Sequence, residues 1–413
     1  MDGTAVVVGA GAIGVASAHY LTEAGFEVTL VDRGEVGHGC SYANAGLIVP
    51  GHSQALPGPG VVAEGLRHLL RHDSPFTIRP RLDPTLAGWL LRFRRACGRE
   101  TYRRSTAILT ELSLASLELF DDLVQKGAAD FGYRHGPLIN AYTQAGWRPR
   151  AEGFARELGE LGIASRAAEP DELSELEPAL GPAVRGALLI EDQATGDCHA
   201  FVRSLADGLA ARGVPIREGT SISRLLVRQG RTDGVLTGEG EELEADVVVL
   251  AAGAWTPALA APLGLRLPIQ PATGYSHTLP NWPGAPRTPV ILDDSHVVVL
   301  PLGDRVRFAG TLELAGFRDR LDRVRSAAVA RAARRALREV PDAEGEAWFG
   351  FRPLMPDDLP AIGRVSGVDG VIVAAGHGTL GFTQSPITGR LVAELATGVT
   401  PTVELEPFRP DRF

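Results

Sequence analysis

The stretch Ala5-Val6-Val7-Val8-Gly9-Ala10-Gly11-Ala12-Ile13-Gly14 decides the fold. Its apolar run predicts a buried strand, its glycines predict a tight turn, and the pattern that continues through Leu21 predicts a helix. Gly9 can make the sharp turn, Gly11 lets a pyrophosphate approach the backbone, and Gly14 lets the helix pack against the strand. The N-terminus of the helix would then face the phosphates.

A second β-rich run, residues 27–31, ends in Asp32, eighteen positions beyond Gly14. This spacing suits a carboxylate that binds the ribose of a dinucleotide. The glycine pattern alone also occurs in turns without function. Here strand, turn, helix, second strand and terminal acid follow in order, which predicts a Rossmann-like dinucleotide-binding unit.

Composition limits the remaining possibilities. A chain of 413 residues favours two domains. With 44% hydrophobic and 22% charged residues, it has the make-up of a soluble globular enzyme. Its formal net charge of −9 argues against a nucleic-acid partner.

The cysteines and the N-terminus bear on the compartment. Cys40, Cys97 and Cys198 stand singly, so we expect neither a disulfide framework nor a metal site. The first strand begins within five residues of the start, which leaves no room for a signal peptide. No apolar run reaches the ~18 residues of a membrane span. We expect a cytoplasmic protein that is not integral to the membrane.

Two features follow the dinucleotide unit. Residues 34–59 form a glycine-rich loop, whose small residues would let the backbone lie against a flat ring. Residues 61–128 have helical spacing and predict a helical insertion. Beside Trp89 and Phe93 this insertion carries a basic stripe, which is either a solvated helix face with paired arginines or a dock for a membrane surface. The stripe consists of Arg92, Arg94, Arg95, Arg99, Arg103 and Arg104.

Later segments complete the cofactor domain. The apolar strand 247–250 ends in small residues, and strand 371–374 leads through a glycine-rich turn into a helix from Ser385. Residues 266–315 read as antiparallel strands. We therefore predict an α/β protein in which a Rossmann-like domain is interleaved with an α+β substrate domain on an antiparallel or mixed sheet. The predicted cofactor domain comprises residues 1–56, 196–265 and 358–413, and the substrate domain comprises 57–195 and 266–357.

This interleaving favours a flavin cofactor. Nicotinamide dehydrogenases seldom need it, whereas a flavin must reach from one domain to the other. A helix N-terminus at the C-terminal turn, aimed at the flavin N1 and C2 carbonyl, would stabilise the reduced ring.

Five segments carry a resemblance that covers essentially the whole chain. They are Ser41-Tyr42-Ala43-Asn44-Ala45-Gly46, Ala194-Thr195-Gly196-Asp197-Cys198, Gly274-Tyr275-Ser276, Gly350-Phe351-Arg352-Pro353-Leu354-Met355-Pro356-Asp357 and Gly376-His377-Gly378-Thr379-Leu380-Gly381-Phe382-Thr383. Together they resemble the catalytic subunit of bacterial D-amino-acid dehydrogenases, a branch of the D-amino-acid oxidase, glycine oxidase and sarcosine oxidase superfamily.

The resemblance implies an FAD-dependent oxidative deamination of D-amino acids to 2-oxo acids and ammonia, with hydride passing from the α-carbon to flavin N5. FAD would be non-covalent, because the segment that bears the attachment cysteine in sarcosine oxidases, here 351–357, contains none. A quinone or another carrier would accept the electrons, with oxygen also possible, and peripheral contact with the inner face of the cell membrane would fit. Two alternatives stay open: an enzyme acting on a cyclic secondary or N-methyl amino acid, and a catalytically silent flavoprotein subunit.

Residue roles carry over position by position. Arg352 would clamp the substrate carboxylate, Tyr275 would give a second carboxylate contact, and His377 would tune the site beside the ring. The other readings are a surface ion pair for Arg352, a half-buried strand aromatic for Tyr275 and a turn residue for His377. The side-chain pocket would come from 47–56 and 293–313. Cofactor contacts would come from Gly9, Ala10, Gly11, Ile13, Gly14, Asp32, Arg33, Ser41, Ala43, Asn44, Gly46, Ile222, Ala252, Gly253, Gly376, Gly378, Thr379 and Leu380.

Overall fold

Strand β1 lies inside a six-stranded sheet of order β18-β19-β12-β1-β2-β8. A computed structural model describes residues 3–68, 76–343 and 345–413. All strands of this sheet pair in parallel except the edge strand β18. The strands are β1 (Gly3–Val8), β2 (Phe26–Val31), β8 (Ile216–Arg217), β12 (Val247–Leu250), β18 (Ala361–Arg364) and β19 (Val371–Ala375).

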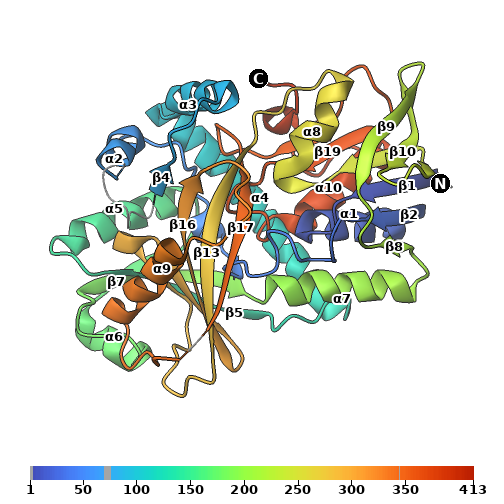
Figure 1. Cartoon of the computed structure of the whole chain (residues 1–413). Helices are drawn as coiled ribbons and strands as arrows, with labels where there is room; N and C mark the ends of the chain where they lie inside the picture. The colour runs from blue at the N-terminus through green and yellow to red at the C-terminus, as the bar shows by residue number, and fades with distance from the viewer. Residues whose placement is uncertain (1–2, 69–75, 344) are drawn as a thin grey trace.

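Both faces of this sheet are covered, which explains its unbroken apolar strands. Helices α1 (Ala12–Glu23), α7 (Cys198–Ala211) and α10 (Ser385–Thr397) share one hydrophobic core with it (Figure 1). The opposite face packs against α8 (Thr256–Ala260) and a small antiparallel sheet. That small sheet contains β9 (Ile222–Arg228), β10 (Arg231–Thr237) and β11 (Glu242–Glu244).

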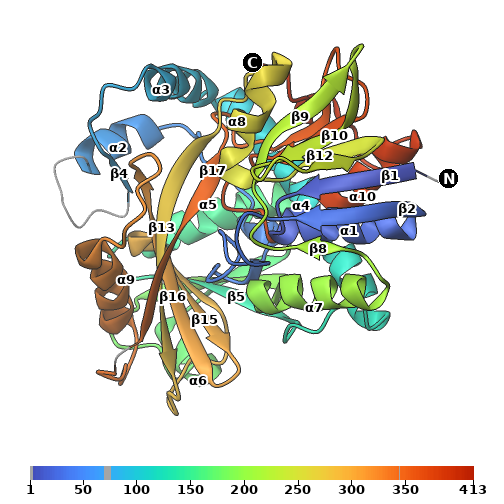
Figure 2. The same ribbon diagram turned by 45° about the vertical axis from the view of Figure 1, so that its right-hand side comes forward.

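A second, ten-stranded mixed sheet has the order β17-β13-β16-β15-β14-β5-β7-β3, with β4 beside β16 and β6 beside β7. Helix α9 (Arg323–Ala336) covers part of one face (Figure 2). The strands are β3 (Leu47–Ile48), β4 (Phe76–Ile78), β5 (Arg134–Tyr142), β6 (Ser165–Ala168), β7 (Gly186–Thr195), β13 (Gln270–Pro280), β14 (Val290–Leu292), β15 (Val297–Leu302), β16 (Arg305–Leu314) and β17 (Glu346–Leu354).

The insertion differs from its predicted form. It contains α2 (Val61–His68), α3 (Pro84–Ala96) and α4 (Arg99–Gln125), but β4 interrupts the helices and pairs with β16. Its residues 69–75 lie outside the described part of the chain. The helical spacing around β4 hid its three residues, because so short a strand carries little periodic signal.

The predicted domain boundaries remain a proposal, which strand membership supports. Every strand of the six-stranded sheet falls in the predicted cofactor ranges, whereas the ten-stranded sheet takes only β3 from them. The acidic stretch from Pro170 to Leu176 predicts a helix, and α6 (Pro170–Leu176) is found there. Helix α5 (Trp147–Glu160) was not predicted, and neither was strand β17.

Candidate functional site

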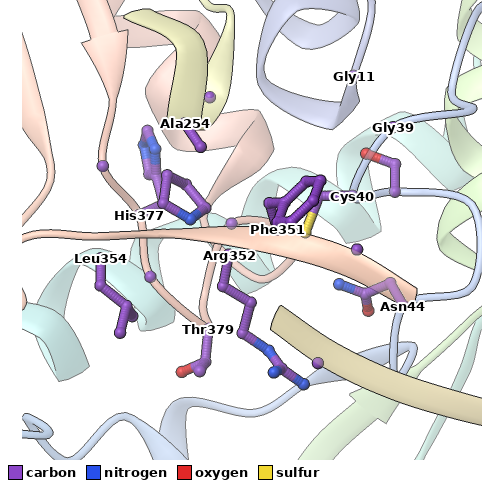
Figure 3. Close-up of a pocket in the computed structure, with 18 of the residues that line it drawn as sticks. Gly11, Gly39, Cys40, Asn44, Ala254, Phe351, Arg352, Leu354, His377 and Thr379 are labelled. Carbon is purple, nitrogen blue, oxygen red and sulfur yellow. The ribbon is translucent and has the colours of Figure 1, made fainter. Parts of the chain in front are cut away.

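A cavity of about 1600 Å³ lies where the two large sheets meet. The carboxyl ends of β1, β2, β12 and β19 border it, which is where open α/β sheets bind ligands. Strands β13, β16 and β17 form another part of the wall (Figure 3). All the predicted site residues line this cavity except Ala10, Gly14 and Gly46.

The glycine turn needs its glycines for steric reasons. Gly9 has a φ of +109°, and a Cβ there would lie 2.5 Å from the carbonyl oxygen of Ala251. A Cβ on Gly14 would lie 1.6 Å from the carbonyl oxygen of Gly9. Gly14 therefore lets α1 approach β1, as predicted, and it acts through packing rather than by lining the cavity.

The N-terminus of α1 offers an anion site. Gly11 and Ile13 line the cavity, and no side chain caps the helix at Gly11. The first N–H groups of a helix lack intrahelical partners and carry partial positive charge. The Ser41 hydroxyl accepts one of them, from Ala12, at 3.1 Å. A glycine-floored helix end of this kind fits a pyrophosphate.

Asp32 is fixed beside that turn. Its Oδ2 accepts the Ala10 N–H at 2.7 Å, and its Oδ1 accepts the Gly34 N–H at 2.8 Å. Ala10 is buried, so its part in the site is to hold Asp32. The carboxylate follows β2 at the cavity edge, where a ribose hydroxyl would be bound.

The glycine-rich loop lines one wall of the cavity. The Arg33 guanidinium lies 4.0 Å from the centre of the Trp255 ring, and Asn44 Oδ1 accepts the Gly46 N–H at 2.7 Å. Gly46 itself, expected to lie along the cofactor, is outside the cavity. Its φ is +63°, and a Cβ there would lie 2.3 Å from a methyl carbon of Leu300, so its glycine serves packing.

The C-terminal turn borders the cavity through Gly376, Gly378, Thr379 and Leu380. Ile222, Ala252 and Gly253 line it as well. The helix after the turn behaves differently from the prediction. Helix α10 begins at Ser385, which is buried and does not line the cavity, because the turn extends further before the helix starts. The turn, rather than the helix N-terminus, faces this space.

Arg352 presents an unpaired cation to the cavity. Its Nη1 donates to the carbonyl oxygen of Thr311 at 2.7 Å. The guanidinium lies flat on β13, where a Cβ on Gly274 would be 2.0 Å from Nη1. No carboxylate in the described ranges forms an ion pair with it, and burial lowers its pKa. Arg352 is therefore not a surface ion pair.

The expected role of Tyr275 is wrong. Arg352 pairs with Ala272 across β13 and β17, whereas Tyr275 pairs with Phe349, and side chains alternate between the faces of a strand. Tyr275 thus points away from Arg352, and its hydroxyl donates to Glu313 at 2.7 Å. The ring is a buried strand aromatic, which was the alternative reading.

His377 is buried and lies within 2.9 Å of the Thr388 hydroxyl through its Nε2. Burial lowers the pKa of His377 to about 3. The imidazole is therefore neutral near pH 7 and cannot supply positive charge there. Its bond to a side-chain hydroxyl differs from the backbone contact expected of a simple turn residue.

The sequence reading missed two histidines and an acid in the cavity wall. His52 and His296 come from the two segments expected to form the side-chain pocket, and both segments reach the cavity. The His52 side chain is open to the cavity, and desolvation by the surrounding protein lowers its pKa to about 4. Asp358, at φ +64°, accepts the Leu56 N–H at 2.8 Å, and burial raises its pKa to about 7. Asp358 comes directly after the quoted segment that ends at Asp357, and nothing else in the sequence pointed to it, because burial cannot be read from a polar residue.

Neither interpretation of the basic stripe agrees fully with the structure. Trp89 and Phe93 are buried, and Trp89 Nε1 donates to the carbonyl oxygen of Leu354 at 3.1 Å. The aromatic part of the membrane dock is therefore wrong. All six arginines are exposed, and they form no ion pair with any carboxylate of residues 3–68, 76–343 and 345–413. The other interpretation, a solvated helix face with paired arginines, is wrong about the pairing.

Other features of the described residues are simple. Cys40, Cys97 and Cys198 are free thiols. Residues 3–68, 76–343 and 345–413 contain no cluster of histidine, cysteine, aspartate and glutamate suited to a metal ion. Within the same ranges, every helix is too short or too polar to cross a bilayer.

A glycine-rich helix end, an acid after β2 and a second sheet with an arginine lacking a carboxylate partner among the described residues surround one cavity, an arrangement that suits a dinucleotide-dependent flavoprotein. Comparison with known proteins gives the family. Residues 4–395 match the family described as FAD dependent oxidoreductase, and the chain belongs to it. FAD is its cofactor.

Two proteins similar to this chain carry the same enzyme name. The chain is 38% identical to D-amino acid dehydrogenase of Methylobacterium nodulans, over 99% of this chain and 98% of that protein. It is 36% identical to D-amino acid dehydrogenase of Xanthobacter autotrophicus, with the same coverage of both chains. Among solved structures, glycine oxidase from Geobacillus kaustophilus superposes with a TM-score of 0.79 at 23% identity, covering 100% of this chain and 99% of that one.

Proposed function

We propose that this protein is an FAD-dependent dehydrogenase that converts D-amino acids to 2-oxo acids and ammonia. The observation that carries the proposal is Arg352, a half-buried guanidinium without a carboxylate partner in the described residues, facing the cavity that the dinucleotide turn also borders. A site that binds a carboxylate needs such a fork. The names of the relatives support the D-amino acid.

FAD, when bound, supplies a ring that accepts a hydride from the α-carbon. Arg352 binds the substrate carboxylate and fixes the α-carbon in the cavity. His377 is a neutral imidazole near pH 7 and has no imidazolium proton to give, and its Nε2 is engaged with Thr388. The proposed reaction needs no proton from His377 if the substrate amine enters neutral or gives its proton to water, and water then hydrolyses the product imine.

The cofactor contacts are part of the same proposal. Gly9, Gly11 and Ile13 would approach the pyrophosphate, and Asp32 would accept from the ribose. Ala10, Gly14 and Gly46 would support them without touching FAD. The remaining contacts would come from Arg33, Ser41, Ala43, Asn44, Ile222, Ala252, Gly253, Gly376, Gly378, Thr379 and Leu380, all of which line the cavity.

The other predicted functions have less support. The relatives reported above bear the name of a D-amino acid dehydrogenase rather than of an enzyme for a cyclic or N-methyl amino acid. A silent subunit would have no use for a half-buried arginine without a carboxylate partner in the described residues, because partly burying a charge without a partner costs free energy.

We predict that FAD is bound without a covalent link. The segment 351–357 contains no cysteine. Cys40 and Cys198 line the cavity, and burial raises the pKa of both thiols. Acid precipitation should leave the yellow colour in the supernatant. A yellow pellet that keeps its flavin in denaturant would contradict the prediction, and the Cys40→Ala variant would then show whether that thiol is the link.

We propose a quinone as the electron acceptor, reached at an anionic membrane surface. The exposed arginines of α3 and α4 support this, as do Val61, Ile78 and Leu90, apolar residues of the insertion that line the cavity. Each cation near such a surface adds about 1 kcal/mol of binding free energy.

The triple variant Arg95→Glu, Arg99→Glu, Arg103→Glu should therefore lose at least tenfold in affinity for anionic vesicles at low salt, at ~1.4 kcal/mol per decade. Arg228→Glu, far from the insertion, is the matched control and should bind like wild type. Equal binding of the triple variant, or oxygen turnover as fast as quinone turnover in the wild type, would rule the acceptor proposal out.

A further inference from the structure

Strand β16 contains a strained bulge next to Arg352. Gly310 pairs with Tyr275 and Glu313 pairs with Thr273, so β16 has one residue more than β13 in this interval. Within it Thr311 has a φ of +63°. A positive φ is rare for a β-branched residue, because its Cβ substituents crowd the backbone.

Such a conformation persists only where the neighbouring structure enforces it. On one side of Thr311, Gly310 pairs with Val297 of β15. On the other side, Leu312–Leu314 pair with Phe76–Ile78 of β4. The backbone of Thr311 is therefore held between two fixed stretches of sheet.

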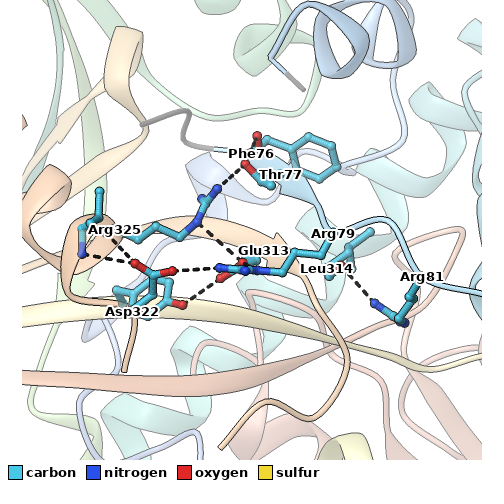
Figure 4. Close-up of polar contacts among 10 residues, drawn as sticks. Phe76, Thr77, Arg79, Arg81, Glu313, Leu314, Asp322 and Arg325 are labelled. Atoms are coloured by element: carbon cyan, nitrogen blue, oxygen red, sulfur yellow. Dashed lines mark hydrogen bonds and ion pairs between the residues drawn. The ribbon is translucent and has the colours of Figure 1, made fainter. Parts of the chain in front are cut away.

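Buried charges hold the second stretch (Figure 4). Glu313 is 1% exposed and forms ion pairs with Arg79 and with Arg325, and it accepts a hydrogen bond from the Tyr275 hydroxyl, on the strand face opposite Arg352. Arg79 Nη2 also donates to Asp322 Oδ2 at 2.8 Å. This network joins β4, β13, β16 and the start of α9, so Glu313 has little freedom to shift and relax Thr311.

The side chain of Thr311 contributes no hydrogen bond of its own. Its hydroxyl is buried and has no partner among the described residues. A threonine that is strained and unsatisfied costs stability, so its environment is not arranged for stability. The conformation acts through the backbone instead, because the Thr311 carbonyl oxygen accepts a hydrogen bond from Arg352 Nη1 at 2.7 Å.

We propose that Thr311 is a positioning residue, whose strained peptide aims its carbonyl at the Arg352 guanidinium and sets the direction of the substrate-binding fork. The inference rests on the proposed function for the role of Arg352. Because one N–H is tied to Thr311, the remaining N–H groups are left for the carboxylate in the cavity. A carbonyl free to rotate would let the fork turn and would weaken carboxylate binding.

The test is Thr311→Gly, because glycine takes a positive φ without strain and lets the peptide rotate. The melting temperature should rise by roughly 1–4 °C. The KM for D-alanine should rise about five- to twentyfold while kcat changes less than about threefold, since the lost order of the fork acts on ground-state carboxylate binding. Thr311→Ala keeps the crowding Cβ and should keep a KM within about twofold of wild type.

Thr273→Gly is the matched control, since Thr273 lies in the same sheet with an equally unpartnered buried hydroxyl but without a positive φ. It should lower the melting temperature. An unchanged KM in Thr311→Gly, or a lower melting temperature, would overturn the proposal. Benzoate titrated against the flavin absorbance reports the fork without turnover. If D-amino acids fail to reduce the wild type while benzoate binding still weakens in Thr311→Gly, the proposed function fails and the positioning role stands.

Discussion

Arg352→Ala is expected to lower kcat/KM for a D-amino acid by about two to three decades, at ~1.4 kcal/mol per decade. A carboxylate that enters the cavity loses its water, and a planar guanidinium replaces that hydration with two parallel charge-assisted hydrogen bonds. Hydrogen bonds to charged groups contribute roughly 1.5–3 kcal/mol, and stranding a buried charge costs on the order of 3–5 kcal/mol. Steady-state kinetics with D-alanine measures the loss.

The controls for Arg352 separate substrate from cofactor. Arg352→Lys keeps the charge without the fork and should lose less activity than Arg352→Ala. Both variants should keep FAD, because Arg352 contacts Thr311 and Gly274 in the second sheet rather than the glycine turn. Wild-type kcat/KM in Arg352→Ala would make a simple amine the better substrate.

Asp32→Ala is expected to raise the Kd for FAD by about 10- to 100-fold, the equivalent of one hydrogen bond to a charged group at roughly 1.5–3 kcal/mol. The loss has two sources. The ribose contact disappears, and the Ala10 and Gly34 N–H groups, at 2.7 and 2.8 Å from the carboxylate, lose their acceptor. Fluorescence of the released flavin after dilution gives the Kd.

Asp32→Asn tells the two sources apart. The amide keeps one oxygen for the turn but no charge, so FAD should bind more tightly than in Asp32→Ala and less tightly than in wild type. The negative charge of Asp32 should also exclude a 2′-phosphate, so NADPH should not bind to the wild type. FAD affinity equal to wild type in Asp32→Ala would remove Asp32 from the cofactor site.

The sequence predicted the parts of the fold that depend on interactions between residues close together in the chain. The β1 strand, its turn and α1 follow from apolar period and glycine spacing within a short stretch. Helix α5 was missed because it lacks a side-chain cap at Gly146 and carries Pro149 and Gly153 in its sequence, which weaken the helical signal.

The same difference between local and long-range causes explains which site residues could be predicted. Arg352 was found through its motif, and the structure gives it a cavity and no counterion within the described ranges. Tyr275 was misassigned because the face on which a strand residue points depends on pairing between β13 and β17, segments far apart in the chain. The positive φ of Thr311 could not be predicted, because two other strands and the charges around Glu313 impose it.

Anaerobic reduction of the bound flavin tests the central claim most directly. Mixed without oxygen or quinone, D-amino acids should bleach the flavin absorbance of the holoenzyme in one turnover and release a 2-oxo acid and ammonia in equal amounts. L-Amino acids, L-proline and sarcosine should leave it oxidised or reduce it far more slowly. Bleaching by a cyclic or N-methyl amino acid but by no D-amino acid, or by no amino acid at all, would contradict the account.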